Sequence, residues 1–263
     1  MKDTHLDSVT CNTDERGVVS LVLNRPDAFN ALSSQVMHTL QNHLDQVAQD
    51  PKARVVVLSA RGKAFCAGHD LREMRANPSL AYYQSLFHQC TEMMMRLQRL
   101  PVPVIAVVNG IATAAGCQLV AMCDLAVSSS TSKFAVSGIN LGLFCSTPSV
   151  ALSRNLARKA AFEMLITGDF ISAEQALSKG LLNAVVSPDQ LDRETERYVS
   201  SILAKPRTAV AIGKKLFYEQ LEQPLHTAYA NAENAMACNM MDEAALEGVQ
   251  AFIDKRTPNW KAL

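Results

Sequence analysis

The sequence predicts an α/β fold with parallel strands. In the first half of the chain, short apolar runs bounded by Gly, Pro, Asn or charged residues alternate with helical stretches. After about residue 149 only helical stretches follow one another. The chain has 263 residues, of which 48% are apolar and 19% are charged, so it can bury roughly 70–75% of its unfolded surface. These observations favour a layered α/β domain and exclude a disordered or fibrous chain.

Apolar runs with turn residues at their ends predict the strands of the first half. The expected strands are Val18–Leu23, Arg54–Ser59, Val104–Val108 and Asp124–Ser128. Ser33 or Ser34 can cap a helix that extends to about Gln49, because apolar residues recur there at helical spacing. The same spacing predicts a helix over Ser79–Gln98.

The second half of the chain is expected to be helical. The predicted helical segments are Val150–Leu156, Lys159–Thr167, Ala173–Lys179, Gln190–Ala204, Arg207–Gln220 and Pro224–Phe252. A short strand is expected within Gly180–Pro188. We predict a core over residues 1–200 and a helical region over residues 201–263 that packs on the core and on neighbouring subunits.

Charge and composition exclude several classes of partner. The 25 basic residues balance the 25 acidic ones without a block of like charge, so neither nucleic acid nor a membrane surface is an expected partner. The longest apolar runs fall well short of the ~20 residues that span a bilayer. The seven cysteines lack a CxxC pair, which predicts no metal site. The first seven residues resemble no export or transit signal, so a cytoplasmic location is expected.

Two turns of small residues stand out as candidate chemistry. Arg61–Leu71 and Asn109–Leu119 each lead from a strand into a helix. Such turns expose backbone N–H groups at a helix N-terminus, and two of them together would form an oxyanion hole. Small residues also serve tight packing at strand-to-helix turns, so the pattern alone leaves both interpretations open.

Four segments, in this order along the chain, are characteristic: Leu23–Leu32, Lys63–Leu71, Pro103–Gly110 and Met122–Asp124. Together they resemble the enoyl-CoA hydratase/isomerase family, also called the crotonase family, and the similarity runs from about Val18 to Trp260. Two further segments, Ala112–Leu119 and Gly142–Pro148, resemble one branch of that family.

The resemblance implies a fold, an assembly and a ligand. The expected fold is a crotonase-type spiral of ββα units with C-terminal helices that form a trimer or a dimer of trimers. The expected ligand is an acyl-CoA thioester, with coenzyme A as part of the substrate and no separate cofactor. The chemistry of the family is that of lyases and isomerases in fatty acid metabolism.

The same resemblance assigns roles in the site. The thioester oxygen of family members lies between two backbone N–H groups, which correspond to His69 and Ala115 here. Each such donor is typically worth about 2.7–4 kcal/mol of transition-state stabilisation. The two glutamates of the family's hydratases correspond to Gln118 and Gly138, which carry no carboxylate. Because each acid–base group is worth roughly 10²–10⁴ in rate, hydratase activity is expected to be weak or absent. A non-catalytic acyl-CoA-binding or regulatory protein is the alternative.

Other side chains could replace the missing carboxylates. The imidazole of His69 is a possible base, although a supporting position is the alternative. Asp70 is expected beside the substrate, where it either takes part or caps a helix. Ser146 occupies a position where another branch carries a reactive residue, and a helix cap is again the alternative. Placing glutamate at both vacant positions is expected to raise hydration.

The remaining candidates concern coenzyme A. Its phosphates favour cations, and Arg25 and Lys63 flank the relevant turns, with a solvated surface position as the alternative. Ala67 lies in the first turn beside the expected substrate. By resemblance, Phe252 and Lys255 complete the site, either from the same chain or from a neighbouring subunit.

Overall fold

The computed structural model describes residues 7–260, so the expectation about a leader segment rests on residues that lie almost entirely outside the described part. A six-stranded sheet, in the order β1-β2-β3-β5-β7-β10, forms the floor of the molecule. Its strands are β1 (Val9–Thr13), β2 (Val18–Leu23), β3 (Val55–Ala60), β5 (Val104–Val108), β7 (Leu125–Ser129) and β10 (Ala184–Val186). All neighbours pair in parallel except β1, which is antiparallel to β2.

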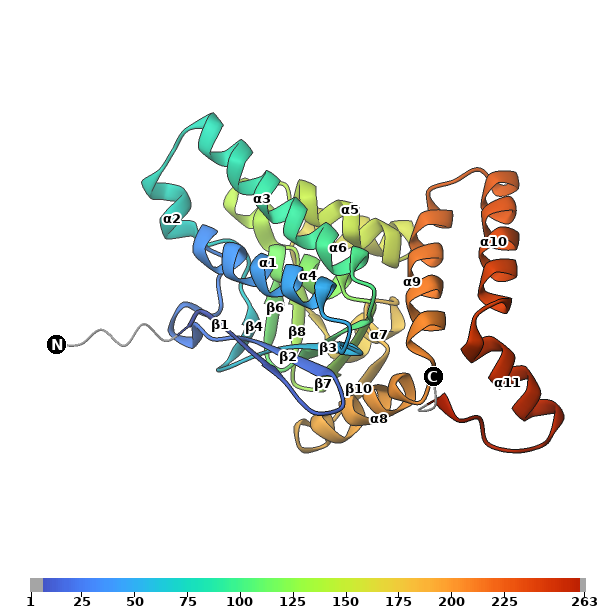
Figure 1. The fold of residues 1–263 in the computed structure, drawn as a ribbon. Coiled ribbons are helices and arrows are strands. Elements are labelled where there is room, and N and C mark those ends of the chain that lie inside the picture. The colour runs from blue at the N-terminus through green and yellow to red at the C-terminus, as the bar shows by residue number, and fades with distance from the viewer. Residues whose placement is uncertain (1–6, 261–263) are drawn as a thin grey trace.

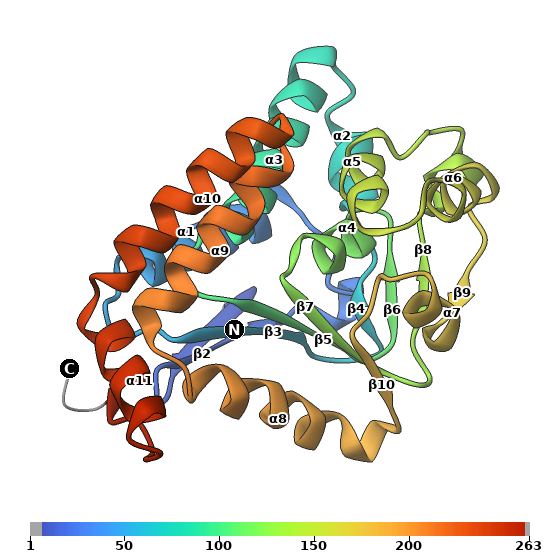
Figure 2. The ribbon, with the colours of Figure 1, turned by 90° about the vertical axis from the view of Figure 1, so that its right-hand side faces the viewer.

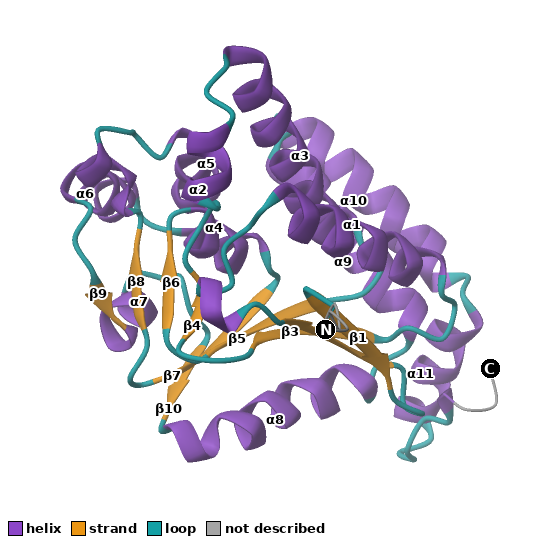
Figure 3. Ribbon diagram, turned by 90° about the vertical axis from the view of Figure 1, so that its left-hand side faces the viewer, coloured by secondary structure: helices purple, strands orange, loops and turns teal. Residues whose placement is uncertain are grey.

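A second, four-stranded sheet stands at a steep angle to the first (Figure 3). It contains β4 (Ala64–Cys66), β6 (Ile111–Thr113), β8 (Lys133–Ala135) and β9 (Ile171–Ser172). Each of β3, β5 and β7 continues into a short strand of this sheet, and a helix follows. This repeat of strand, short strand and helix is the spiral of ββα units that the resemblance implied.

Helices cover both faces of the floor sheet (Figure 2). Those before the C-terminal region are α1 (Ser34–Gln49), α2 (Leu71–Ala76), α3 (Leu80–Arg99), α4 (Ala115–Met122), α5 (Ser146–Asn155), α6 (Arg158–Thr167), α7 (Ala173–Ser178) and α8 (Leu191–Leu203), with short 3₁₀ turns η1 (Pro26–Ala28), η2 (Ser137–Leu141) and η3 (Pro188–Gln190). Ser33 caps α1 and Ser79 caps α3. The large apolar core lies between α1, α3, α4 and the two sheets, and a smaller cluster lies between the floor sheet and α8.

The C-terminal helices are α9 (Arg207–Leu221), α10 (Leu225–Met240) and α11 (Glu243–Ile253). The prediction of one helix over Pro224–Phe252 is wrong, because the chain turns after Met240 and the carboxylate of Asp242 accepts the amide of Ala244 to start a new helix. Since α8 runs to Leu203, a division after residue 200 would fall inside that helix, and the proposed domain limits stay a prediction. Among residues 7–260, no helix combines the length and the apolar character needed to cross a membrane.

Candidate active site

The two turns that the sequence singled out are packed directly against each other. Strands β4 and β6, which lead into them, pair in parallel. A Cβ atom added to Gly116 would lie 2.1 Å from the carbonyl oxygen of Cys66, and one added to Gly68 would lie 3.3 Å from the amide nitrogen of Ala115. Glycine is therefore required at position 116, and the backbones of the two turns are in van der Waals contact.

Each turn offers one unused amide. Leu32 pairs with the first turn by donating to the carbonyl of Gly68 and accepting from the amide of Asp70, which leaves the N–H of His69 free. Ala115 is the first residue of α4, so its amide has no acceptor within the helix. Neither amide donates a hydrogen bond to any residue between 7 and 260. The two turns in contact thus each present a free backbone donor, and their use as an oxyanion hole for a thioester oxygen stays a prediction.

The backbone before α4 is strained. Ala114 has φ 51° and ψ −123°, a conformation that side chains rarely adopt. Such strain costs on the order of 1–3 kcal/mol and persists only where the surroundings enforce it. Here the amide of Ala114 donates to the carbonyl of Ala135 at 3.0 Å, which aligns the start of α4 with the first turn.

Gln118 occupies the first position where family hydratases carry glutamate. Its side chain lies on α4, one helical turn after Ala115, and the residue is only 5% exposed. Its Oε1 atom is buried and accepts no hydrogen bond within the described part of the chain. A buried amide oxygen without a donor is costly unless water or a ligand satisfies it.

Gly138 occupies the second position, and its surroundings leave no room for a side chain. An added Cβ would lie 2.6 Å from the Sγ atom of Cys145 and 2.6 Å from the carbonyl oxygen of Leu143. The amide of Leu143 donates to the carbonyl of Gly138 at 3.0 Å, so this segment is folded back onto the glycine. The expectation that glutamates at both positions would raise hydration stays a prediction, and the contacts show that a side chain at position 138 requires the segment around Leu143 and Cys145 to move.

Both ring nitrogens of the His69 imidazole are buried. Its ring lies edge-on to Phe87 of α3, with the ring centroids 5.5 Å apart. Neither ring nitrogen has a hydrogen-bond partner among the described residues. Burial lowers the pKa of His69, although the carboxylate of Glu73 opposes that shift. The ring is therefore neutral at pH 7.

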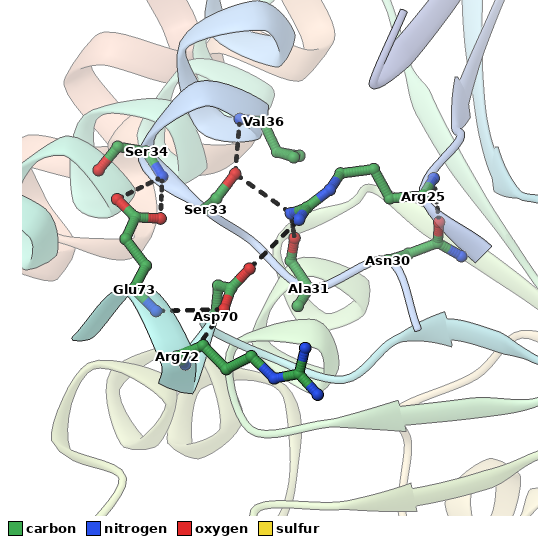
Figure 4. Close-up of polar contacts among 9 residues, drawn as sticks. All are labelled: Arg25, Asn30, Ala31, Ser33, Ser34, Val36, Asp70, Arg72 and Glu73. Carbon is green, nitrogen blue, oxygen red and sulfur yellow. Dashed lines mark hydrogen bonds and ion pairs between the residues drawn. The ribbon is translucent and has the colours of Figure 1, made fainter. Parts of the chain in front are cut away.

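Arg25 is held by protein groups (Figure 4). Its guanidinium donates to the carbonyl of Ala31 at 3.1 Å and to the hydroxyl of Ser33 at 3.3 Å, and it pairs with Asp70 at 3.3 Å. These contacts tie the turn after β2 to the start of α2. They leave little of the guanidinium for a phosphate group of coenzyme A, so the predicted role of Arg25 at the nucleotide stays untested.

Asp70 acts as a helix cap (Figure 4). Its Oδ1 atom accepts the amides of Arg72 at 3.1 Å and Glu73 at 3.3 Å, which begin α2. The carboxylate of Glu73 in turn accepts the amide of Ser34 at the start of α1. The alternative of capping, considered from the sequence, is therefore the one that the hydrogen bonds favour.

Asn30, within the characteristic segment Leu23–Leu32, is a positioning residue that was not among the predicted site residues. It is 1% exposed and adopts φ 54°, and its side-chain amide donates to the carbonyls of Arg61 and Ala64 at 2.8 Å and 2.7 Å. Its Oδ1 atom accepts the amide of Arg25 at 2.8 Å. These bonds hold the entry to β4 in place. Apart from its place in that segment, the signal in the sequence is that asparagine tolerates a positive φ better than most residues.

The remaining predicted site residues lie in the segment of the first turn or at the start of α5. Lys63 is exposed just before β4, whereas Ala67 lies within the first turn and donates its amide to the carbonyl of Phe29. Ser146 is exposed and is the first residue of α5; its hydroxyl donates to the carbonyl of Phe144 and does not cap the helix.

Phe252 and Lys255 are not brought to the turns within one chain. Phe252 is 85% exposed on α11, and Lys255 follows that helix with φ 54°. Helix α11 lies at the end of the molecule opposite α2, as two views show (Figures 1 and 2). A contribution of these residues to the same site therefore requires a second subunit.

The cysteines around the site are unreactive thiols. Burial raises the pKa of Cys66, Cys90 and Cys117 to about 12, and it also raises the pKa of Cys145. All seven cysteines are free. Among the described residues, no group of three His, Cys, Asp or Glu side chains is placed to hold a metal ion.

Comparison with known proteins gives one consistent result. The family model described as "Enoyl-CoA hydratase/isomerase" matches residues 13–262. Enoyl-CoA hydratase domain-containing protein 3 of Mus musculus is 46% identical over 252 residues, which cover 96% of this chain and 84% of the mouse protein.

Solved structures of relatives superpose closely on this one. The crystal structure of an enoyl-CoA hydratase from Mycobacterium smegmatis matches with a TM-score of 0.95 and 62% identity, and it covers 96% of this chain and 98% of that chain. That of human enoyl-CoA hydratase domain-containing protein 3 matches with a TM-score of 0.93 and 44% identity over 96% of this chain and 100% of that chain. The predicted crotonase-type fold and the predicted branch are confirmed.

The expected cytoplasmic location is wrong. The mouse, rat, zebrafish and human relatives of that branch are named as mitochondrial proteins. An argument from the absence of a leader in the first residues therefore does not establish where a protein of this kind resides.

Proposed function

This chain belongs to the enoyl-CoA hydratase/isomerase family, and from that premise we propose that it binds acyl-CoA thioesters at the two packed turns but hydrates them poorly or not at all. The observation that carries the proposal is a site with its two backbone donors intact and both carboxylate positions lost. The physiological reaction, if there is one, belongs to acyl-CoA chemistry of the kind found in fatty acid metabolism.

Two adjacent N–H groups support thioester binding. The amides of His69 and Ala115 belong to turns in contact and have no acceptor within residues 7–260. A thioester oxygen placed between them would receive two hydrogen bonds, and any negative charge that develops on it would be stabilised by fixed dipoles. Ala115 is as good a donor as glycine, because only its backbone takes part.

Buried polar atoms without partners support a ligand or ordered water at the same place. The Oε1 atom of Gln118 and both ring nitrogens of His69 are shielded from bulk solvent and unbonded among the described residues. Buried polar atoms in proteins are almost always satisfied by protein, water or ligand. Both residues belong to the turns that carry the free amides, so the unsatisfied atoms and the free donors belong to one site.

The surroundings of Gly138 argue against hydration. The segment that carries Leu143 and Cys145 fills the space into which a side chain at 138 would project. The loss of the second carboxylate is therefore built into the backbone of this segment, and Gln118 has no usable proton affinity near neutral pH. With two acid–base groups absent, the expected loss in rate is several orders of magnitude.

A binding assay and a turnover assay together test the proposal. Butyryl-CoA, which cannot be hydrated, is titrated by calorimetry, and hydration of crotonyl-CoA is followed by loss of the enoyl thioester absorbance. We expect saturable binding and a raised melting temperature with butyryl-CoA, together with negligible hydration. Absence of binding at millimolar butyryl-CoA would refute the site, and brisk hydration would show that another group, with His69 first, transfers the proton.

Substitutions sharpen that experiment. Gln118→Glu restores one carboxylate at a position that already holds a side chain of the same size, so it is expected to raise hydration modestly. Gly138→Glu is expected to add nothing and to lower stability, because of the 2.6 Å contacts described above. If wild type and Gln118→Glu both bind thioesters and turn over none, the alternative of an acyl-CoA-binding or regulatory protein follows.

Coenzyme A is proposed to be held by few groups of the same chain. Lys63 is an exposed cation at the first turn, whereas Arg25 is already engaged by Asp70. Phe252 and Lys255 are proposed to reach the site from a neighbouring subunit. Coenzyme A is then part of the substrate, and no other cofactor is proposed.

Two separate apolar surfaces support assembly into a ring. One lies on the C-terminal helices and includes Phe217, Leu221, Leu225, Tyr229, Met236, Met241 and Phe252, all exposed. The other lies around η2 and α6 and includes Leu141, Leu143, Phe144, Phe162, Ile166 and Phe170, all exposed. Two different surfaces that bind each other form a head-to-tail contact, which closes into a ring when the rotation between neighbouring subunits is one third of a turn, as a trimer requires. We propose a homotrimer or a dimer of trimers.

A further inference from the structure

A cavity with charged residues in its wall lies at the end of the floor sheet where β3 begins, away from the two turns, which follow the ends of β3 and β5. Its volume is about 650 Å³. It lies between the start of β3, the connection from α8 to α9, the start of α11 and the ring of Trp260. Figure 2 shows the beginnings of α9 and α11 and the end of α8 converging there. The proposed thioester site uses none of these residues.

Two arginines cross each other in the wall of this cavity. Arg54, at the start of β3, donates to the carbonyls of Leu203 and Lys205 at 3.2 Å and 2.7 Å. Arg207, at the start of α9, reaches back to the carbonyl of Ala53, the residue before Arg54, at 3.1 Å. Each side chain therefore binds the backbone close to the other residue, and both arginines line the same cavity.

The positive charge of this pair is not neutralised by an ion pair. In residues 7–260, Arg54 and Arg207 bind only carbonyl oxygens, and neither forms a salt bridge. The Nη1 donors of both guanidinium groups remain unused. Burial lowers the pKa of Arg54, and the nearby positive charge of Arg207 lowers it further.

The start of α9 adds further donors. Its N-cap is Pro206, which has no side-chain acceptor, so the first amides of this 15-residue helix are unpaired. The exposed ammonium group of Lys205 also borders the cavity. Acidic groups are present as well: Glu243 lines the cavity, and Asp242 accepts the hydroxyl of Thr208 and caps α11.

We propose that this cavity is an anion site that takes a phosphate group, either free or as a phosphomonoester. A tetrahedral dianion can accept hydrogen bonds from both guanidinium groups at once and would neutralise the charge that the protein leaves uncompensated. This site is independent of the proposed thioester function, so either can fail without the other.

Titration with inorganic phosphate, followed by calorimetry in chloride buffer, tests the site. We expect one saturable site with a Kd of about 1 mM or tighter. Arg54→Gln and Arg207→Gln are each expected to weaken binding by about tenfold or more, because a charge-assisted hydrogen bond is lost. Arg193→Gln, which changes an exposed arginine at the far end of α8, is the matched control and should leave the Kd unchanged.

Two further measurements keep the test decisive if an arginine variant fails to fold. Asp242→Asn keeps a cap for α11 but removes a negative charge, and it is expected to tighten phosphate binding several-fold. Glycerol 3-phosphate is the second probe: tighter binding than inorganic phosphate identifies an esterified ligand, and weaker binding identifies the free ion. The proposal is overturned if wild type shows no saturable phosphate binding at about 20 mM, or if folded Arg54→Gln or Asp242→Asn has the affinity of wild type.

Discussion

Gly116 sets the distance between the two amide donors, because nothing larger fits against the first turn. A methyl group at this position would collide with the carbonyl of Cys66, whereas one at Gly213, in the middle of α9, would meet nothing within 4 Å. Gly116→Ala is therefore expected to lower the free energy of unfolding by about 1–3 kcal/mol and to weaken butyryl-CoA binding. The matched change Gly213→Ala is expected to raise the free energy of unfolding by about 0.5–1 kcal/mol, because alanine favours a helix. Urea unfolding measures both, and equal effects would contradict the packing argument.

His69 makes the stability of the protein depend on pH. Burial lowers its pKa in the folded state below the value of about 6.5 expected for an unfolded chain. As the pH falls through about 6.5, the unfolded state therefore takes up a proton first, and the free energy of unfolding decreases, by at most about 1.4 kcal/mol per pH unit. Above that pH both states hold a neutral ring and this contribution is constant.

Replacing the ring isolates that contribution. His69→Phe keeps an aromatic ring against Phe87 and should flatten the decrease in unfolding free energy as the pH falls below about 6.5. His88→Gln, at an exposed position on α3, should leave the slope as in wild type. Urea unfolding at a series of pH values gives the slopes, and an unchanged slope in His69→Phe would show that the ring is not buried neutral.

At the scale of single elements, α2 depends on Asp70 as a cap. Asp70→Asn keeps the side-chain oxygen for the amides of Arg72 and Glu73 but loses the ion pair with Arg25. It is expected to cost less than about 1 kcal/mol, whereas Asp70→Ala is expected to cost about 0.5–2 kcal/mol more because the cap is lost. If Asp70→Asn retained full stability yet abolished turnover of a thioester substrate, a catalytic role would replace the capping role.

Helix α9 is anchored to the core by one buried lysine. The ammonium group of Lys214 donates to the carbonyls of Leu97 and Val102 at 2.8 Å and 2.9 Å, and to Asp124 at 2.6 Å. Tyr218, one turn later, donates to the other oxygen of Asp124 at 2.8 Å. Burial lowers the pKa of Lys214, so these partners are what keep it charged.

Breaking this anchor should be costly. Lys214→Met is expected to lower the free energy of unfolding by about 3–5 kcal/mol, because the carboxylate of Asp124 is left buried without its cation. Lys215→Met changes the next residue, whose side chain is 75% exposed, and should cost less than about 0.5 kcal/mol. Urea unfolding compares the two, and similar values would show that α9 is held by apolar packing alone.

For the whole molecule, the prediction concerns mass. If the two apolar surfaces bind each other in a ring, light scattering should give about three or six times the 28.6 kDa of one chain. Phe252→Asp should shift the mass toward a monomer and weaken thioester binding, because the proposed contribution from the neighbouring subunit is lost. Leu80→Asp, at an exposed position outside both surfaces, is the control. A monomeric wild-type protein at micromolar concentration would contradict both the ring and the shared site.

Part of the fold and of the site was predictable from local pattern. The strands Val18–Leu23 and Val104–Val108 have the predicted bounds, because both are predominantly apolar runs between turn residues or charged residues. Ser33 caps α1 as expected. By contrast, β4 and β6 are only three residues long, which is too short for a period to be recognised. The break before α11 was missed because Met240 and Met241 continue the apolar pattern across it.

The sequence by itself determined that two carboxylates are missing. Neither Gln118 nor Gly138 can act as a general acid or base through its side chain, whatever position the fold gives it. The sequence also determined the family, because several motifs in one order specify a fold that local propensity alone does not. Only the tertiary structure decided that Gly116 must be glycine, that the space beside Gly138 is filled, and that the charge of Arg25 is already engaged. Each of these depends on a contact between segments far apart along the chain, and the free energy of such a contact is set by packing distances that no local pattern encodes.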